Sequence, residues 1–325
     1  MIYTLTCNPS LDHIVFVDNI SRGALNRMKD DKIFYGGKGI NISRVLKELG
    51  VESTLLGFSA GFTGTEIERA LTEMGLKCDF VRLADGMTRI NIKLKTFNRH
   101  GMDCNTSTID VNETEINGSG PEVSSDDIEK MKEQIREIKA DDILIMSGSL
   151  AKGMPADSLK QFVDELEEGT RVIFDLSGDA LRSVLPLKPF LIKPNHLELG
   201  EFFNIDIESN DEDTVIFFAK KLKEMGAANV LVSMGKDGCV LVADDGRIYR
   251  QTAPQGQIIN TVGSGDSMIA GFVAGISSEK YMNADPAVRS YEDAIHLAVA
   301  AGSATAFTAD LANHDQIQTI LRVMS

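Results

Sequence analysis

Residues 260–273 read Asn-Thr-Val-Gly-Ser-Gly-Asp-Ser-Met-Ile-Ala-Gly-Phe-Val, and this stretch says most about the fold. Gly263 and Gly265 leave the backbone N–H groups of a turn unobstructed, and the apolar run from Met268 predicts a buried helix behind them. The amino end of a helix favours anions. Asp266 is unusual in such a place, and we interpret it as a base beside a phosphate. Taken alone, the pattern also fits an ordinary glycine-rich helix start.

A second glycine-rich stretch, Gly-Gly-Lys-Gly-Ile-Asn, occupies residues 36–41, and the amphipathic pattern of a helix follows from Ile42 to Leu49. It fits neither the GxxxxGK[ST] phosphate loop nor the GxGxxG dinucleotide fingerprint. Glycines let a ligand approach the backbone. Lys38 offers a point charge for a phosphate, and Asn41 offers both a donor and an acceptor to a hydroxyl. By itself this stretch is a weak indication of a binding site.

Short apolar runs bounded by turn residues recur along the chain and predict strands that are buried on both faces. These runs are Ile2–Thr6, Ile143–Met146, Val172–Phe174, Phe190–Ile192 and Val230–Val232. Helical patterns lie between them, for example over residues 215–225. Alternating strands and helices predict a three-layer α/β/α fold with a mostly parallel central sheet. Ligands of such folds bind at the carboxyl ends of the strands.

Two segments break this alternation. Residues 13–34 and 88–115 alternate between polar and apolar side chains, as in Arg-Ile-Asn-Ile-Lys-Leu-Lys at 89–95, and this predicts half-exposed strands. We expect them to form a small β-sheet lid, inserted at about 12–36 and 86–118 into a single domain that spans residues 1–325. The polar stretch 98–112 predicts an extended hairpin loop.

Composition excludes several classes of protein. The 325 residues include 33 Lys and Arg against 48 Asp and Glu, a net charge of −15, which leaves no basic surface for nucleic acid. No apolar run is long enough to span a bilayer and no signal peptide is apparent, so we expect a cytoplasmic protein that does not bind membranes. The four cysteines are widely spaced, and this pattern predicts neither a disulfide framework nor a zinc site.

The order and separation of the two glycine-rich stretches resemble the two signatures of the ribokinase-like, or PfkB, carbohydrate kinases, over essentially the whole chain. The carboxyl-terminal stretch matches throughout. The amino-terminal signature departs near its end, where Ala60 stands at a position that is usually Gly. This departure concerns a local turn.

The resemblance implies roles for single residues. Gly263, Ser264 and Gly265 would stabilise charge on the transferred phosphoryl group, and Asp266 would be the catalytic base. At 193–198, Lys-Pro-Asn-His-Leu-Glu resembles the family's Asn-x-x-Glu element.

By the same resemblance, Asn195 and Glu198 would organise Mg²⁺ indirectly. ATP would be bound by residues of three turns, namely Lys193, Ser233, Gly235, Gly238, Gly263 and Gly265.

Asn26-Arg27, Lys38 and the segment 88–93 resemble the branch of the family that acts on sugars already phosphorylated. The resemblance therefore implies ATP-dependent transfer to the 6-hydroxyl of fructose 1-phosphate, with tagatose 6-phosphate and fructose 6-phosphate as alternative acceptors. It also implies a homodimer that pairs through the lids. The substrate would be held by Asp12, Arg27, Gly37, Lys38, Asn41 and Arg89. Arg27 and Arg89 also fit exposed charges on the lid.

Two other classes of function fit the sequence less well. A non-catalytic sugar-phosphate sensor would be expected to lose the base or the glycines beside it, and this chain keeps Gly263, Gly265 and Asp266. An NAD-dependent dehydrogenase requires GxGxxG after the first strand. The chain has Cys-Asn-Pro-Ser at 7–10 instead.

Overall fold

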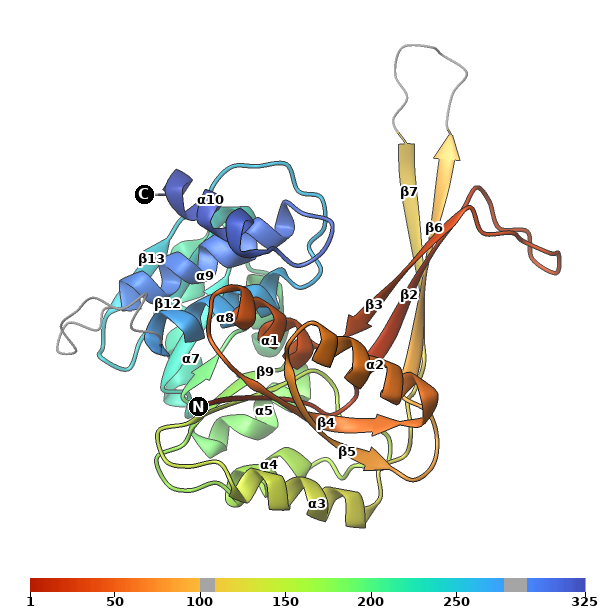
Figure 1. Ribbon diagram of the computed structural model, residues 1–325. Coiled ribbons are helices and arrows are strands. Elements are labelled where there is room, and N and C mark those ends of the chain that lie inside the picture. The colour runs from red at the N-terminus through yellow and green to blue at the C-terminus, as the bar shows by residue number, and fades with distance from the viewer. Residues whose placement is uncertain (100–108, 278–290, 325) are drawn as a thin grey trace.

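Figure 1 shows the computed structural model of the protein, which describes residues 1–99, 109–277 and 291–324. The central sheet has the strand order β13-β12-β11-β10-β9-β8-β1-β4-β5. The strands from β5 to β11 in this order run parallel, whereas β12 pairs antiparallel with both of its neighbours, β11 and β13. Their bounds are β1 Ile2–Thr6, β4 Thr54–Ala60, β5 Lys77–Leu83, β8 Ile143–Ser147, β9 Arg171–Asp175, β10 Leu191–Ile192, β11 Asn229–Ser233, β12 Cys239–Val242 and β13 Ile248–Gln251.

Helices cover both faces of this sheet (Figure 1). One apolar cluster packs against α3 (Ser125–Arg136), α4 (Ser158–Asp164), α5 (Gly178–Val184), α6 (His196–Phe203) and α7 (Glu212–Glu224). A second cluster packs against α1 (Lys38–Glu48), α8 (Ser264–Ser277), α9 (Tyr291–Ala306) and α10 (His314–Met324). Within β8, Leu144 and Met146 belong to the first cluster, whereas Ile143 and Ile145 belong to the second. The predicted three-layer fold is therefore confirmed.

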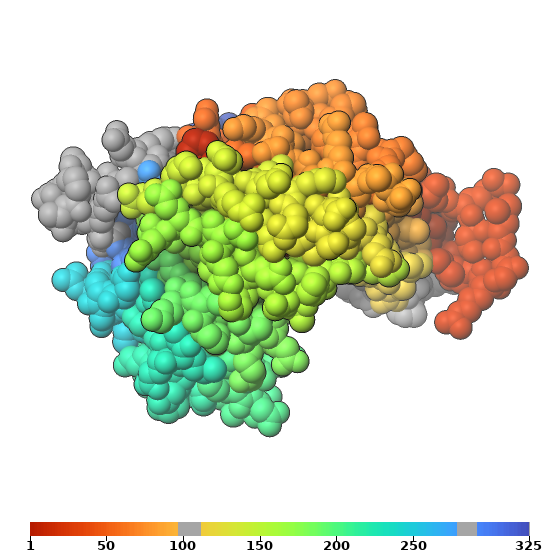
Figure 2. Space-filling view, turned by 90° about the horizontal axis from the view of Figure 1, so that it is seen from below, coloured from red at the N-terminus to blue at the C-terminus, as the bar shows by residue number. Residues whose placement is uncertain are grey.

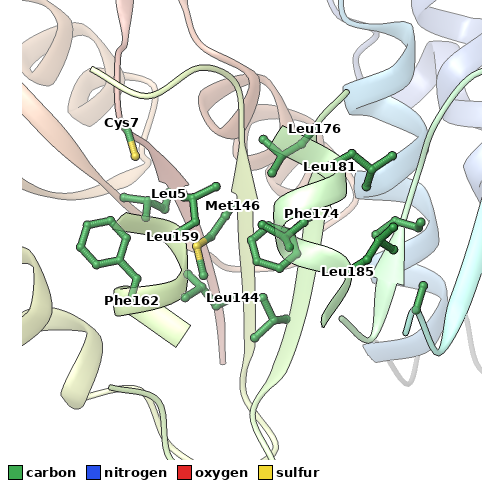
Figure 3. Packing of buried hydrophobic residues seen from close by; sticks show 14 of the residues in the cluster. Leu5, Cys7, Leu144, Met146, Leu159, Phe162, Phe174, Leu176, Leu181 and Leu185 are labelled. Atoms are coloured by element: carbon green, nitrogen blue, oxygen red, sulfur yellow. The ribbon is translucent and has the colours of Figure 1, made fainter. Parts of the chain in front are cut away.

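Figure 3 shows part of the first cluster, where Phe162 of α4 and Phe174 of β9 lie among leucine side chains. Both rings are fully buried. Burying a Phe side chain stabilises a fold by about 1.5–3 kcal/mol. A third, smaller cluster packs α2 (Gly61–Glu73) against the sheet through Ile67 and Leu71. No helix among the described residues is long and apolar enough to cross a membrane.

The lid sheet consists of β2 (Ser10–Val17), β3 (Asp30–Gly36), β6 (Arg89–Arg99) and β7 (Ile109–Asn117), in the order β3-β2-β6-β7. It projects from the body of the molecule (Figure 1). Pairing of β6 with β7 continues to Arg99 and Ile109, so the ends of the predicted 98–112 loop are strand and its centre lies outside the described residues. The predicted second sheet is present, built from the two segments that break the α/β alternation.

The departure from the amino-terminal signature lies where β4 meets α2. Ala60 ends the strand, and Gly61 begins the helix with a positive φ of 61°. A Cβ at Gly61 would lie 2.8 Å from the carbonyl oxygen of Gly86, so the close approach requires glycine here. The departure therefore concerns a single turn.

Candidate active site

The carboxyl ends of β1, β8, β9, β10 and β11 and the base of the lid surround a cavity of about 510 Å³. Its position agrees with the rule that ligands of parallel sheets bind beyond the strand ends. The cavity brings together most of the residues that the sequence predicted: Asp12, Gly37, Lys38, Asn41, Arg89, Lys193, Asn195, Glu198, Ser233, Gly263, Gly265 and Asp266.

Asp266 lies in the first turn of α8, with 6% of its surface exposed. Asn41 of α1 donates a hydrogen bond from Nδ2 to Asp266 Oδ2 over 2.8 Å, and thereby joins the two glycine-rich stretches. Burial, followed by the nearby negative charge of Asp175, raises the pKa of Asp266 to about 6. A carboxylate with this pKa is ionised at neutral pH and is a better proton acceptor than an ordinary Asp.

The turn before Asp266 presents backbone to the cavity. Gly263 has a positive φ of 81°, and a Cβ there would lie 2.5 Å from Leu311 Cδ2. A Cβ at Gly265 would lie 3.1 Å from Lys193 Nζ, so that ammonium group faces the turn. Ser264 begins α8 but does not line the cavity, and its buried Oγ has no hydrogen-bond partner within the described chain. The turn combines helix N–H groups with a lysine, which suits a phosphoryl group.

Asp175, at the end of β9, holds two of the predicted lysines. Its Oδ2 lies 2.8 Å from Lys38 Nζ and its Oδ1 lies 3.3 Å from Lys193 Nζ. Burial alone would raise the pKa of Asp175, but the two lysines outweigh it and hold the pKa below its usual value. Burial would likewise lower the pKa of Lys38, and Asp175 instead holds it above its usual value. Asp175 and Lys38 are therefore both charged at neutral pH.

The lid side of the cavity is built around Asp12. Its Oδ1 accepts hydrogen bonds from Ser10 Oγ (2.7 Å) and Asn91 Nδ2 (2.9 Å). Arg89 is half-buried beside it, and burial lowers the pKa of Arg89 although Asp12 opposes this shift. The Nε donor of Arg89 is buried and has no hydrogen-bond partner within the described chain. A phosphate oxygen would satisfy that donor.

A family model described as pfkB family carbohydrate kinase matches residues 6–316. The chain belongs to the PfkB family. As a member it is a kinase that uses ATP.

Three related proteins illustrate the range of the PfkB family around this chain. A 1-phosphofructokinase of Bacillus subtilis is 41% identical over 322 residues, which cover 99% of this chain and 97% of that protein. A D-tagatose-1-phosphate kinase of Bacillus licheniformis is 35% identical and covers 99% of both chains. The crystal structure of phosphofructokinase-2 from Escherichia coli with fructose-6-phosphate is 28% identical, with a TM-score of 0.83 over 99% of this chain and 98% of that one.

Four predicted site residues do not line the cavity, namely Ser264, Gly235, Gly238 and Arg27. Gly235 and Gly238 frame the short 3₁₀ turn after β11, next to Ser233, which does line it. Arg27 is exposed in the connection between β2 and β3, which protrudes from the body in Figures 1 and 2. The roles predicted for these four residues, at ATP, at the substrate phosphate and, for Ser264, at the transferred phosphoryl group, remain predictions.

Several cavity residues were not among the predicted site residues. Asn8 and Ser149 lie two residues beyond the ends of β1 and β8, and Asp175 is the last residue of β9, so the rule about strand ends could have found them. Asn91 lies within a lid strand, where alternation alone gives no sign of a site.

Asn195 and Glu198 form a reciprocal cap at the start of α6. Asn195 Oδ1 accepts from the Glu198 N–H, and Glu198 Oε2 accepts from the Asn195 N–H, each over 2.8 Å. No group of three His, Cys, Asp or Glu in the described ranges could ligate a metal directly. Mg²⁺ in kinases keeps several waters and binds through few carboxylates plus the substrate phosphates, so the two residues fit an indirect role.

The pKa of Asp266 predicts how the rate of this PfkB kinase depends on pH. The base must be ionised to accept a proton, so kcat/KM for the acceptor should fall about tenfold for each pH unit below about 6. A pH–rate profile from 4.5 to 8 measures this fall, which forms the acidic limb of the profile. Asp175→Asn removes a nearby negative charge and should move the limb to lower pH. A profile that stays flat down to pH 5 would contradict the assignment of the base.

Proposed function

We propose that the chain transfers the γ-phosphoryl group of ATP to the 6-hydroxyl of fructose 1-phosphate, which yields fructose 1,6-bisphosphate and ADP. The observation that carries this proposal is a single cavity lined both by Asp266, a base with a raised pKa, and by Arg89, whose Nε donor has no partner among the described residues. The base suits a hydroxyl acceptor, and the guanidinium suits a phosphate that the acceptor already carries. The Bacillus subtilis relative at 41% identity, named 1-phosphofructokinase, supports this choice of acceptor.

The acceptor would lie between Asp12 and the glycine-rich start of α1. Asp12 Oδ2 accepts no hydrogen bond from the residues that the structure describes, so it would accept from the sugar hydroxyls. Asn41 and the backbone of Gly37 would bind beside it. Arg89 lies next to Asp12 and would bind the 1-phosphate. The 6-hydroxyl would then reach Asp266.

Transfer would proceed in line. Asp266 accepts the proton of the 6-hydroxyl while that oxygen forms a bond to the γ-phosphorus and the bond to the β-phosphate oxygen breaks. The N–H groups from Gly263 to Asp266 stabilise the charge that develops on the phosphoryl oxygens. Because Lys38 is paired with Asp175 and its charge is coupled to Asp266 and Glu198, we assign it to the transferred phosphoryl group as well as to the substrate phosphate.

A coupled assay of ADP release tests the proposal. The panel contains fructose 1-phosphate, tagatose 1-phosphate, tagatose 6-phosphate, fructose 6-phosphate and free fructose, each with ATP and Mg²⁺. We expect kcat/KM for fructose 1-phosphate to exceed the others by about tenfold or more. Absence of turnover on every acceptor, with ATP still bound, would favour a sugar-phosphate sensor instead.

Tagatose 1-phosphate is the second candidate acceptor, because a relative at 35% identity over nearly the whole chain is named for it. Tagatose differs from fructose only in the configuration at C4. One hydroxyl contact therefore separates the two substrates, and such a contact decides specificity without changing the base or the anion site. A preference for tagatose 1-phosphate in the panel would keep the mechanism and change the acceptor.

Arg89→Ala should raise KM for fructose 1-phosphate about tenfold or more and leave KM for ATP within about twofold, because a hydrogen bond to a charged group contributes about 1.5–3 kcal/mol. Steady-state kinetics with each substrate varied in turn measures both constants. Arg82→Ala is the matched control, since Arg82 is exposed on β5 and paired with Glu68. Equal increases in both constants would contradict the role of Arg89.

Removal of Mg²⁺ should abolish turnover. We propose that Asn195 and Glu198 organise the ion through its waters. When bound, Mg²⁺ would neutralise charge on the ATP phosphates and so weaken their repulsion from the carboxylate of Asp266. Excess EDTA should reduce ADP release to background, and added MgCl₂ should restore it. Full activity in EDTA would exclude a metal requirement.

We also propose a homodimer through the lids. On the face of the lid sheet opposite Asp12, the exposed side chains of Ile33, Ile92 and Ile116 stand in one row across the sheet, with His13 of β2 between Ile33 and Ile92. This row leaves apolar surface in solvent. Arg27 does not reach the cavity of its own chain, so a role at a substrate phosphate would need a second subunit. Light scattering should give twice the mass of 35.4 kDa, and a monomer at micromolar concentration would contradict the pairing.

A further inference from the structure

Asn91 is a residue of the lid strand β6 and lines the cavity of the candidate active site. It is a polar residue with only 6% of its surface exposed. On β6 it stands in register with Asp12 of β2 on one side and with Asn117 of β7 on the other. Buried amides are retained where they make specific hydrogen bonds, so the partners of Asn91 indicate what it does.

Both ends of the Asn91 amide are occupied. Nδ2 donates to Asp12 Oδ1 over 2.9 Å, and Oδ1 accepts from the backbone N–H of Gly118 over 3.2 Å. Only one orientation of the amide satisfies both bonds, because a carboxylate accepts and an N–H donates. The backbone at the end of β7 thus fixes the direction in which Asn91 presents its donor.

The hydrogen bonds of Asp12 are all on one oxygen. Oδ1 accepts from Ser10 and Asn91, whereas Oδ2 accepts no hydrogen bond from the described residues and lies 3.8 Å from the ammonium group of Lys93. Lys93 Nζ also lies 3.8 Å from Glu115 Oε1 and makes close contact with neither carboxylate. Without the Asn91 donor, the Asp12 carboxylate could turn toward Lys93 and form a closer ion pair.

We propose that Asn91 is a positioning residue, which holds the carboxylate of Asp12 so that Oδ2 faces the cavity for the sugar hydroxyls. This inference rests on the proposed function, in which Asp12 binds the acceptor. It predicts that Asn91 affects the sugar through Asp12 and does not affect ATP, because its described hydrogen bonds are to the lid strands.

Two variants test the role. Asn91→Ala removes the donor. Asn91→Asp keeps the shape and the oxygen that accepts from Gly118, so it preserves the lid, but it replaces the donor with a second carboxylate beside Asp12. We expect kcat/KM for fructose 1-phosphate to fall about tenfold in the first variant and further in the second, mainly through KM. KM for ATP should stay within about twofold. Asn117→Ala is the matched control, because Asn117 is exposed on the neighbouring strand and donates only to Glu115 among its described contacts.

A double-mutant cycle separates positioning from a general loss of structure. If Asn91 acts through Asp12, Asn91→Ala should change kcat/KM less than about twofold in the Asp12→Ala background. The same fold-loss in both backgrounds would overturn the proposal, and so would an Asn91→Asp variant that melts at the wild-type temperature with an unchanged KM for the sugar.

The outcomes also separate the proposed function from the role of Asp12 and from the positioning role of Asn91. If wild-type protein does not phosphorylate a sugar phosphate, the proposed function is wrong. If wild-type protein is active and Asp12→Ala has no effect, the role of Asp12 is wrong and the inference fails with it. If Asp12→Ala impairs the sugar and Asn91→Ala does not, only the positioning role is wrong.

Discussion

Asp266→Asn should lower kcat by at least a hundredfold and leave the affinity for ATP within about threefold. The amide keeps the size and the hydrogen bond to Asn41 but cannot accept the proton of the hydroxyl, and loss of a general base typically costs 10²–10⁴-fold. Turnover is measured by ADP release at saturating acceptor, and ATP binding by titration calorimetry. Retained binding would locate the defect in the chemical step.

The control is Asp126→Asn, an exposed residue in the first turn of α3 at a distance from the cavity. It should leave kcat unchanged. A kcat for Asp266→Asn within about tenfold of wild type would show that another group removes the proton. Loss of ATP affinity in the same variant would instead show that Asp266 is needed to hold the turn around Gly263 and Gly265.

Asp175→Asn should lower the free energy of unfolding by about 3 kcal/mol, because removal of one partner from a buried ion pair leaves the other charge uncompensated. The side chains of Asp175 and Lys193 are only 5% and 6% exposed. Most of the loss in stability therefore comes from the buried ammonium group of Lys193, which would be left without its partner. Lys38 is 41% exposed and can turn toward water. Urea unfolding at pH 7 measures the change.

Asp179→Asn is the matched control, four residues along the chain and exposed in the first turn of α5. It should change the free energy of unfolding by less than about 0.5 kcal/mol. If Asp175→Asn is equally harmless, the ion pairs around it contribute little to stability, and the role of Asp175 is confined to the position and charge of the two lysines.

The sequence predicted the parallel strands well where burial on both faces produced uninterrupted apolar runs. β1 begins and ends as predicted, and β8, β9 and β11 extend one or two residues further. β4 and β5 were not among the predicted strands. β4 contains Gly57, where a Cβ would lie 2.4 Å from the carbonyl oxygen of Thr6, and β5 carries alternating charges at the sheet edge. Both features interrupt the apolar pattern that identifies a strand.

The site was predictable where a local motif required special residues, as at Gly263, Gly265 and Asp266. It was not predictable where the chemistry arises from register or from partners distant in sequence. Asn91 is one polar residue in an alternating strand, and the positioning role that we propose for it depends on its place opposite Asp12. Asp175 ends an ordinary buried strand, and only the fold brings Lys38 and Lys193 to its two oxygens.

The hydrogen bond from Asn41 to Asp266 joins residues 225 positions apart in the chain. During translation the amino-terminal half therefore leaves the ribosome with its sugar-side residues and without the base or the anion turn. β1 also lies between β4 and β8, so the centre of the sheet cannot form until residues 143–147 have been synthesised. Contacts of such long range form late in folding. A nascent or prematurely terminated chain thus lacks Asp266 and the turn at Gly263 and Gly265, and we expect it to be unable to transfer a phosphoryl group.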